Sequence, residues 1–410
     1  VSTELVRFVQ GITYAGSVPS PAELTGDFSH TLNAAGKPII IYDPQTTRAN
    51  PIGSGFIRDP FLNNVIPPNR INSVSARMRT YFPAPNLAGA QFTGANNYVR
   101  TDANRIEKNT YSTRLDHNFT DTTRFFMRYS HDDSPLIRAS PYGSDNAGSP
   151  GFGPQVFTRH NAVVEVNHVF SPSLIATLRG SYSRLSNFRG PISQGFDITQ
   201  LGFPANFAPQ VGAPAAFPGV NITGYTVSGS IPNSARVGAL GSTGLIAFGM
   251  NNYALQGQVA KSFRQHELRM GGEARVIQFN ALQTGDASNL FSFTSAFTQG
   301  PNPSQSTATA GSALATFLLG IPSGSVVPSP ALAMQSTYYG GFLQDQWKVT
   351  GKFTLNLGLR YEIETPRTER RNQLTNFDYG ATPPLPAPGL NLHGALAFVG
   401  VKGVARYQAN

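Results

Sequence analysis

The stretch from Tyr338 to Glu364 decides the fold: YYGGFLQDQWKVT (338–350), Gly351-Lys352, then FTLNLGLRYEIE (353–364). From Phe353 to Ile363, apolar side chains stand at every second position, with polar or small ones between them. Such a period of two with one apolar face indicates a β-strand, and a short polar connection between two such segments indicates an antiparallel hairpin. Asp345 is an exception, because it falls on the apolar face of the first segment without a reason visible in the pattern.

Three further pairs of segments repeat this pattern. Two of them turn at Thr120–Thr122 and Ser171–Ser173, and the third pair runs through Tyr253–Phe263 and Leu268–Val276. Each predicted strand has about 9–13 residues, the length that a tilted strand needs to cross a bilayer. The connections between the hairpins are long and rich in Gly, Pro, Asn and Ser. Short turns at one end and long loops at the other are typical of outer-membrane β-barrels.

Composition narrows the class of protein. The 410 residues are 40% hydrophobic and only 13% charged, with 28 Phe, 15 Tyr and no Cys. The aromatic content excludes a disordered chain, and the lack of Cys excludes disulfide scaffolds and thiolate chemistry. No apolar run is long enough for a transmembrane helix. The richest stretch, Ala313–Ile321, predicts a short helix packed within a long loop, capped by Ser312 and ended by Gly320. The chain opens and stops as an internal fragment of a longer protein would.

Aromatic residues on the apolar faces are spaced as in a membrane barrel. They lie near both ends of each predicted strand, eight to ten residues apart, with aliphatic residues between. Two aromatic girdles around an aliphatic band are expected where rings prefer the headgroup level. A soluble sheet whose ends are filled by large rings is the alternative. The predicted girdle consists of Tyr111, Phe119, Tyr253, Phe263, Tyr339, Trp347, Phe353 and Tyr361.

The opposite faces of the strands are charged, and we expect them to face the barrel lumen. The expected lumen-facing residues are Arg114, Arg124, Arg128, Arg179, Arg269, Arg275, Arg360, Glu165, Glu273 and Glu362, with Asp116, Glu267 and Glu364 beside them. They would form either a salt-bridge lattice between strands or a hydrated passage for a plug or substrate. No nucleophile, metal or cofactor motif is present, so we predict no catalytic, metal or cofactor site. The net charge of +9 is dispersed, which argues against a nucleic-acid partner.

These residues also carry a family resemblance. The hairpin 338–350 and 354–362 resembles the barrel hairpin of TonB-dependent outer-membrane receptors. Four further segments resemble the Oar-like branch of that family and keep its order along the chain. They are Ala313–Pro322, Arg370–Asp378, Ser17–Pro19 with Gly26–Ser29, and Asn64–Ile71.

The resemblance implies an all-β fold: a fragment of an antiparallel transmembrane barrel of about 22 strands with long extracellular loops. It implies that residues 1–105 are mainly an extracellular loop region and that 106–366 hold four hairpins. Residues 367–410 would hold a loop and the start of the next barrel strand. It also implies an outer-membrane receptor that imports or exports a bulky substrate, with its own plug domain, the TonB complex, outer-membrane lipid and lipopolysaccharide as partners.

Two other classes of protein remain open at this point. One is a passive porin- or adhesin-like barrel without TonB coupling. The other is a soluble β-rich module that binds carbohydrate. The substrate is unknown, with carbohydrate or peptide as the expected classes; loop aromatics such as Phe217 and Tyr225 are candidates to stack on a sugar.

Overall fold

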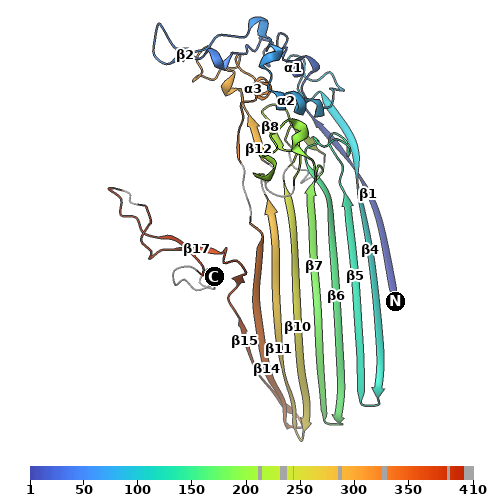
Figure 1. Cartoon of the computed structure of the whole chain (residues 1–410). Coiled ribbons are helices and arrows are strands. Elements are labelled where there is room, and N and C mark those ends of the chain that lie inside the picture. The colour runs from blue at the N-terminus through green and yellow to red at the C-terminus, as the bar shows by residue number, and fades with distance from the viewer. Residues whose placement is uncertain are drawn as a thin grey trace.

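One large sheet dominates the molecule. The computed structural model describes residues 1–210, 215–230, 238–242, 244–284, 289–325, 330–385 and 388–400, and within them it shows an 11-stranded sheet in which every pairing is antiparallel (Figure 1). The four predicted hairpins are present with the predicted turns. They are β4 (Tyr98–Thr120) with β5 (Thr123–Ile137), β6 (Phe152–Ser171) with β7 (Leu174–Pro191), β10 (Leu245–Phe263) with β11 (His266–Thr284), and β14 (Leu332–Thr350) with β15 (Phe353–Glu364).

Neighbouring hairpins pair with one another, so the sheet is continuous. Its strand order is β15-β14-β11-β10-β7-β6-β5-β4-β1-β9. From β1 to β15 the order follows the chain, because each long connection returns to the next position in the sheet, while β9 lies beside β1 at the edge. All four short turns therefore lie at one end and all the long connections at the other (Figure 1).

One strand of the sheet was not predicted. β1 (Ser2–Gly16) pairs with β4 along its whole length, from Ser2 opposite Ser112 to Gly16 opposite Tyr98. The expectation for residues 1–105 was mainly a loop region. β1 escapes a pattern search because its apolar residues, Leu5-Val6 and Phe8-Val9, fall on both faces of the strand.

The strands are also longer than predicted. β4 has 23 residues and β10, β11 and β14 have 19 each. The sequence signal stops where the apolar face stops, but the backbone hydrogen bonds continue beyond it. Each paired strand is therefore longer than the segment in which apolar and polar side chains visibly alternate.

The long connections fold together into a cap at the end of the sheet opposite the short turns (Figure 1). We use the name cap for residues 17–97, 138–151, 192–244 and 289–331, as far as the structure describes them. Its elements are α1 (Pro21–Thr25), α2 (Ser73–Met78), α3 (Ala313–Leu319), β2 (Arg48–Ala49), β3 (Phe56–Ile57), β8 (Gly219–Ile222), β9 (Val227–Gly229), β12 (Leu290–Phe293), β13 (Ser323–Ser325) and the single-turn helices η1 (Pro44–Thr46), η2 (Leu62–Asn64), η3 (Pro68–Arg70), η4 (Arg79–Tyr81), η5 (Ile198–Leu201), η6 (Ala208–Gln210) and η7 (Ser295–Phe297).

A hydrophobic core holds the cap together. The predicted helix is α3, with Ser312 as its N-cap and Gly320 in the left-handed conformation that ends it. Leu314 and Phe317 of α3 are fully buried among side chains from all four connections, including Phe217. Loops of this length are stable in the cap because each one supplies part of a shared core.

The C-terminal region lies mostly outside the large sheet. β16 (Thr368–Glu369) pairs with β14, while β17 (Thr375–Asp378) and β18 (Ala395–Phe398) form a separate hairpin. The start of the next barrel strand was predicted within residues 367–410, and residues 401–410 of that range lie outside the described residues.

Candidate functional site

The two faces of the sheet differ in chemistry, and the register shows why. Because side chains alternate along a strand, residues directly opposite each other lie on the same face. Leu343 lies opposite Leu359 and Val259 opposite Met270, whereas Glu165 lies opposite Arg179. We call these the apolar face and the charged face. All residues expected in the lumen lie on the charged face, and all residues expected in the girdle lie on the apolar face.

On the charged face, most arginines are held by carboxylates. Arg179 donates from Nε to Glu165 Oε2 at 2.6 Å across the β6–β7 pair. Four further ion pairs join residues two apart on the same strand. They are Arg114–Asp116 and Arg269–Glu267, with shortest N–O distances of 2.7 and 2.6 Å, together with Arg275–Glu273 and Arg360–Glu362.

A small polar hollow lies on the charged face where β7, β10, β11, β14 and β15 run together. It has a volume of about 200 Å³ and is lined by side chains that include Arg179, Gln256, Glu273 and Arg360. Gln256 donates to Glu273 at 2.9 Å. The arrangement holds charges of both signs in fixed positions, as the wall of a polar passage does.

The apolar face carries aromatic rings at two levels. Of the predicted girdle residues, Trp347 is half-buried and the other seven are exposed; Tyr361 is 71% exposed. The structure adds residues that the sequence analysis missed. Tyr182 packs against Tyr253 at 5.0 Å, and His131 and His160 lie together at 4.7 Å beside Tyr111 and Tyr129. These residues occupy the same alternating positions on their strands as the predicted girdle residues, and this shared alternation is the sequence feature that could have identified them.

A row of polar side chains ends the apolar face on the cap side. Arg184 donates to Asn251 at 2.8 Å, Asn251 to Gln278 at 3.4 Å, and Gln278 to Gln335 at 3.0 Å. The row crosses β7, β10, β11 and β14 just beyond the level of Tyr182 and Tyr253. An apolar band bounded by rings and then by polar groups matches the profile of a bilayer.

The loop aromatics proposed to stack on a sugar lie inside the cap. Phe217 is fully buried and packs edge-on against Tyr81. Tyr225 packs against the cap core, and its hydroxyl donates to Glu23 Oε1 at 3.2 Å. Burial, together with the nearby charge of Glu23, raises the pKa of Tyr225 well above its usual value. Phe217 therefore has no free face for a ligand, whereas Tyr225 is half-buried and also lines a cavity.

This cavity of the cap is lined by Tyr225 among other residues. It has a volume of about 590 Å³ and is formed by parts of the chain that are far apart in sequence: 17–39, 92–97, 223–225 and 295–313. The ring of Phe92 and the side chains of Asp27, His30 and Asn33 are among those that line it. A cavity of this size with a few polar groups is typical of small-ligand sites.

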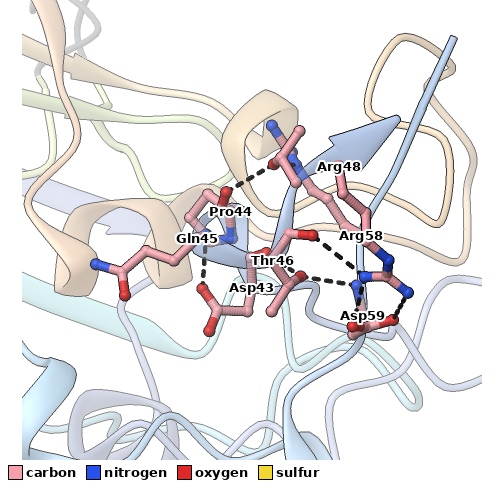
Figure 2. A network of polar contacts seen from close by, with 8 residues as sticks. Asp43, Pro44, Gln45, Thr46, Arg48, Arg58 and Asp59 are labelled. Atoms are coloured by element: carbon pink, nitrogen blue, oxygen red, sulfur yellow. Dashed lines mark hydrogen bonds and ion pairs between the residues drawn. The ribbon is translucent and has the colours of Figure 1, made fainter. Parts of the chain in front are cut away.

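Polar contacts fix the outer hairpin of the cap, β2–β3. Figure 2 shows Arg48 and Asp59 joined by two hydrogen bonds of 2.6 and 2.9 Å, and Asp43 accepting from the N–H of Gln45 at 2.9 Å. Arg58 donates to Thr47 at 2.9 Å and to the carbonyls of residues 296, 297 and 299. The hairpin is thereby tied to the connection between β11 and β14.

A second carboxylate of this region is held more deeply. Asp43 also accepts two hydrogen bonds from Arg70, of 2.7 and 2.8 Å, and its side chain is only 12% exposed. Burial raises the pKa of Asp43, but the hydrogen bonds from Arg70 and Gln45 outweigh it, so the pKa lies below its usual range.

Neither metal sites nor spanning helices are found in the described parts of the chain. No cluster of three or more His, Asp or Glu side chains there is arranged to hold a metal ion. No helix in those parts is long and apolar enough to cross a membrane.

Among solved structures, three show a weak similarity to this chain. The pyoverdine-bound FpvA of P. aeruginosa is 11% identical, with a TM-score of 0.38 over 66% of this chain and 33% of that one. The outer membrane transporter YddB of Escherichia coli is 10% identical, with a TM-score of 0.36 over 68% and 32%. The siderophore receptor PiuA of Acinetobacter baumannii is 11% identical, with a TM-score of 0.34 over 65% and 36%.

The chain thus spans about a third of the length of these three proteins. No curated protein matches the sequence. The family model described as outer membrane beta barrel domain matches residues 1–410, the whole chain. The chain therefore belongs to the outer membrane beta barrel domain family, and its place in the cell is the outer membrane.

Proposed function

We propose that this chain is the barrel segment of a TonB-dependent outer-membrane receptor that carries a bulky substrate through a plug-gated barrel, without bond chemistry. In this proposal the apolar face meets lipid and lipopolysaccharide, and the charged face lines the lumen. The plug and the TonB complex act as partners from outside the chain. The segments that resemble the Oar-like branch support placing the receptor in that branch.

The observation that carries the proposal is the combination of a two-faced sheet with a folded cap. A passage needs a polar wall, which the fixed ion pairs of the charged face supply. Selective capture needs a shaped surface rather than flexible loops, and the cap has a hydrophobic core and a cavity of about 590 Å³. Phe92 offers a ring and His30 an imidazole to a carbohydrate or peptide substrate in that cavity.

The test uses the absence of cysteine from the 410 residues. Gln258→Cys places a thiol on the charged face, and Val259→Cys places one on the apolar face of the same strand. Each variant is made in the full-length protein, freed of any cysteine outside this chain. Whole cells are then treated with a membrane-impermeant maleimide, in strains with and without TonB.

A gated receptor labels at position 258 at a rate that depends on TonB and on the membrane potential, while position 259 stays unreactive. Equal labelling at position 258 in both strains would instead identify a passive porin-like barrel. Reaction of both positions in a protein that is soluble without detergent would identify the soluble module.

A further inference from the structure

The cavity of the cap is negative in a chain that is positive overall. The 410 residues carry a net charge of +9. The described residues that line the cavity nevertheless include two carboxylates, Glu23 and Asp27, and neither a lysine nor an arginine. The cavity therefore has a charge preference opposite in sign to that of the whole chain.

Glu23 has only uncharged partners. It accepts four hydrogen bonds, and their donors are the N–H of Ser20 at 3.0 Å, the hydroxyl of Ser20 at 2.9 Å, the hydroxyl of Thr31 at 3.1 Å and the hydroxyl of Tyr225 at 3.2 Å. These bonds fix the carboxylate in the wall of the cavity without cancelling its charge. An anionic ligand would meet this like charge on entering, which disfavours its binding.

Asp27 adds a second negative charge that is available to a ligand. Ser29 is its only hydrogen-bond donor among the described residues, with the N–H at 2.9 Å from Oδ1. The hydrogen bonds from Ser29 lower the pKa of Asp27, so the group is ionised at neutral pH. A carboxylate has about four acceptor positions, and most of those on Asp27 remain open to donors on a ligand.

An aromatic ring is held at the same cavity. Phe92 lies in the middle of a tight loop that is closed by a backbone hydrogen bond of 2.7 Å from Ala90 to Ala95. The ring packs on Gly36, where a Cβ atom would lie only 3.3 Å from it, so a side chain at that position would crowd the ring. Phe92 is nevertheless 44% exposed. The cavity thus contains a positioned ring with accessible apolar surface.

The remaining wall offers small polar groups. His30, Thr93 and Ser295 line the cavity from separate parts of the chain. The hydroxyl of Thr93 accepts from the N–H of Ala95 at 3.2 Å, which leaves its proton for another partner. The imidazole of His30 and the hydroxyl of Ser295 form no hydrogen bond with the described residues. Groups that both donate and accept suit a ligand whose own polar groups do the same.

The walls do not suit a peptide. Extended peptides commonly bind by adding a strand to an exposed sheet edge. None of the lining residues lies in a strand that the structure describes, so the cavity offers no such edge.

A sugar without acidic groups meets all these conditions. The C–H face of a sugar ring stacks on an aromatic ring, and sugar hydroxyls donate to carboxylates and accept from side-chain hydroxyls. We propose that the cap cavity binds an oligosaccharide free of carboxylate and sulfate groups, with Phe92 against a sugar face and Asp27 accepting from its hydroxyls. This inference names the substrate class of the receptor and rests on the proposed function.

The experiment measures which glycans the full-length protein binds. The protein, purified in detergent, is applied to an array of neutral, amino-bearing and acidic glycans and, in parallel, to an array of peptides. We expect it to bind glycans that lack carboxylate and sulfate groups. Binding to acidic glycans as strongly as to neutral ones, to peptides alone, or to neither array would overturn the inference.

One pair of variants tests the ring. F92A should weaken binding of the best neutral glycan about tenfold, the loss expected when a stacked aromatic contact is removed. F56A removes another exposed phenylalanine of the cap, from β3 outside the cavity, and should leave binding unchanged. Equal effects of the two substitutions would show that the sugar does not bind in this cavity.

A second pair tests the charge. D27K replaces a carboxylate of the cavity with an ammonium group and should allow acidic glycans to bind. D59K makes the same change in the cap outside the cavity and should not. Rejection of acidic glycans by D27K as complete as that by the native protein would contradict the role given to Asp27. The proposed function fails separately, through labelling at position 258 that does not depend on TonB.

Discussion

Nδ1 of His266 lies 2.7 Å from Oδ2 of Asp345 on the apolar face, and the same imidazole stacks on the indole of Trp347 at 5.3 Å. His266 begins β11 and Asp345 is near the end of β14, so the pair sits beside the short turns. This contact explains why a carboxylate interrupts the apolar alternation of β14. A charged group costs little near the edge of the apolar band and most at its middle.

The first prediction concerns this pair. We expect His266→Ala and Asp345→Ala to be coupled by about 0.5–1.5 kcal/mol, the net value of a hydrogen bond between such groups. The measurement is a double-mutant cycle on refolding into lipid vesicles. Trp347, the only tryptophan in the 410 residues, reports the transition by its fluorescence. Additive effects of the two substitutions would show that the contact contributes nothing to stability.

The second prediction tests which face meets lipid. Leu359 is 74% exposed, lies opposite Leu343 and is close to the middle of the apolar band. Leu359→Arg should therefore destabilise the full-length protein by about 2–4 kcal/mol in vesicles. Asn356→Arg, on the charged face of the same strand, should cost much less. Leu357 is a weaker probe, because an arginine there would face Asp345. Similar losses at positions 356 and 359 would contradict the assignment of the faces.

The third prediction concerns acid sensitivity of the cap. The pKa of Asp43 is lowered when the protein is folded, so its bond to Arg70 stabilises the cap above about pH 4 and is lost as the pH falls through the folded value. Asp43→Asn should remove this contribution, about 1.5–3 kcal/mol, and flatten the pH dependence. Pepsin cleavage of the cap between pH 2 and 6 provides the measurement.

The matched control for that prediction is Asp59→Asn. The Arg48–Asp59 bond is similar in length, but its side chains are about half exposed. Solvent screens such a pair, so the cleavage rate should change little. An equal change in both variants would show that the burial of Asp43 is not the cause.

The fourth prediction separates the cap from the sheet. Leu314 is fully buried in the cap core, so Leu314→Ala should destabilise the cap by about 2–5 kcal/mol. The sheet should remain intact, since Leu314 contributes nothing to its ladder. Limited proteolysis of the cap checks the first effect, and retention of heat-modifiable mobility on electrophoresis checks the second. Loss of both would show that the cap and the barrel fold as one unit.

The sheet was predictable from the sequence to the extent that its side chains alternate. Hairpins such as β14–β15 follow directly from alternation, because one face of each strand is apolar and the other is not. β1 lacks that contrast. The cap end of β4 loses it where both faces become polar, and the cap end of β10 loses it where both faces become apolar. In these parts the pairing is determined by the neighbouring strand, and a local sequence pattern carries no information about that strand.

The cap was much less predictable. Ser312 and Gly320 marked the ends of α3, and its apolar composition indicated burial. Phe217 looked like a candidate ligand contact, but tertiary packing buries it in the core, whereas Tyr225 packs against the core and also lines the cavity. Likewise, Asp43 and Arg70 are 27 positions apart, and only the folded chain brings them together.

The shared core of the cap has a consequence for how outer-membrane barrels of this kind diversify. Each of the four connections supplies side chains to one interior, so replacing any single connection leaves a void that the others cannot fill. New specificities should therefore arise at the cavity rim, at positions such as Phe92 and His30, while the four connections are inherited as a set.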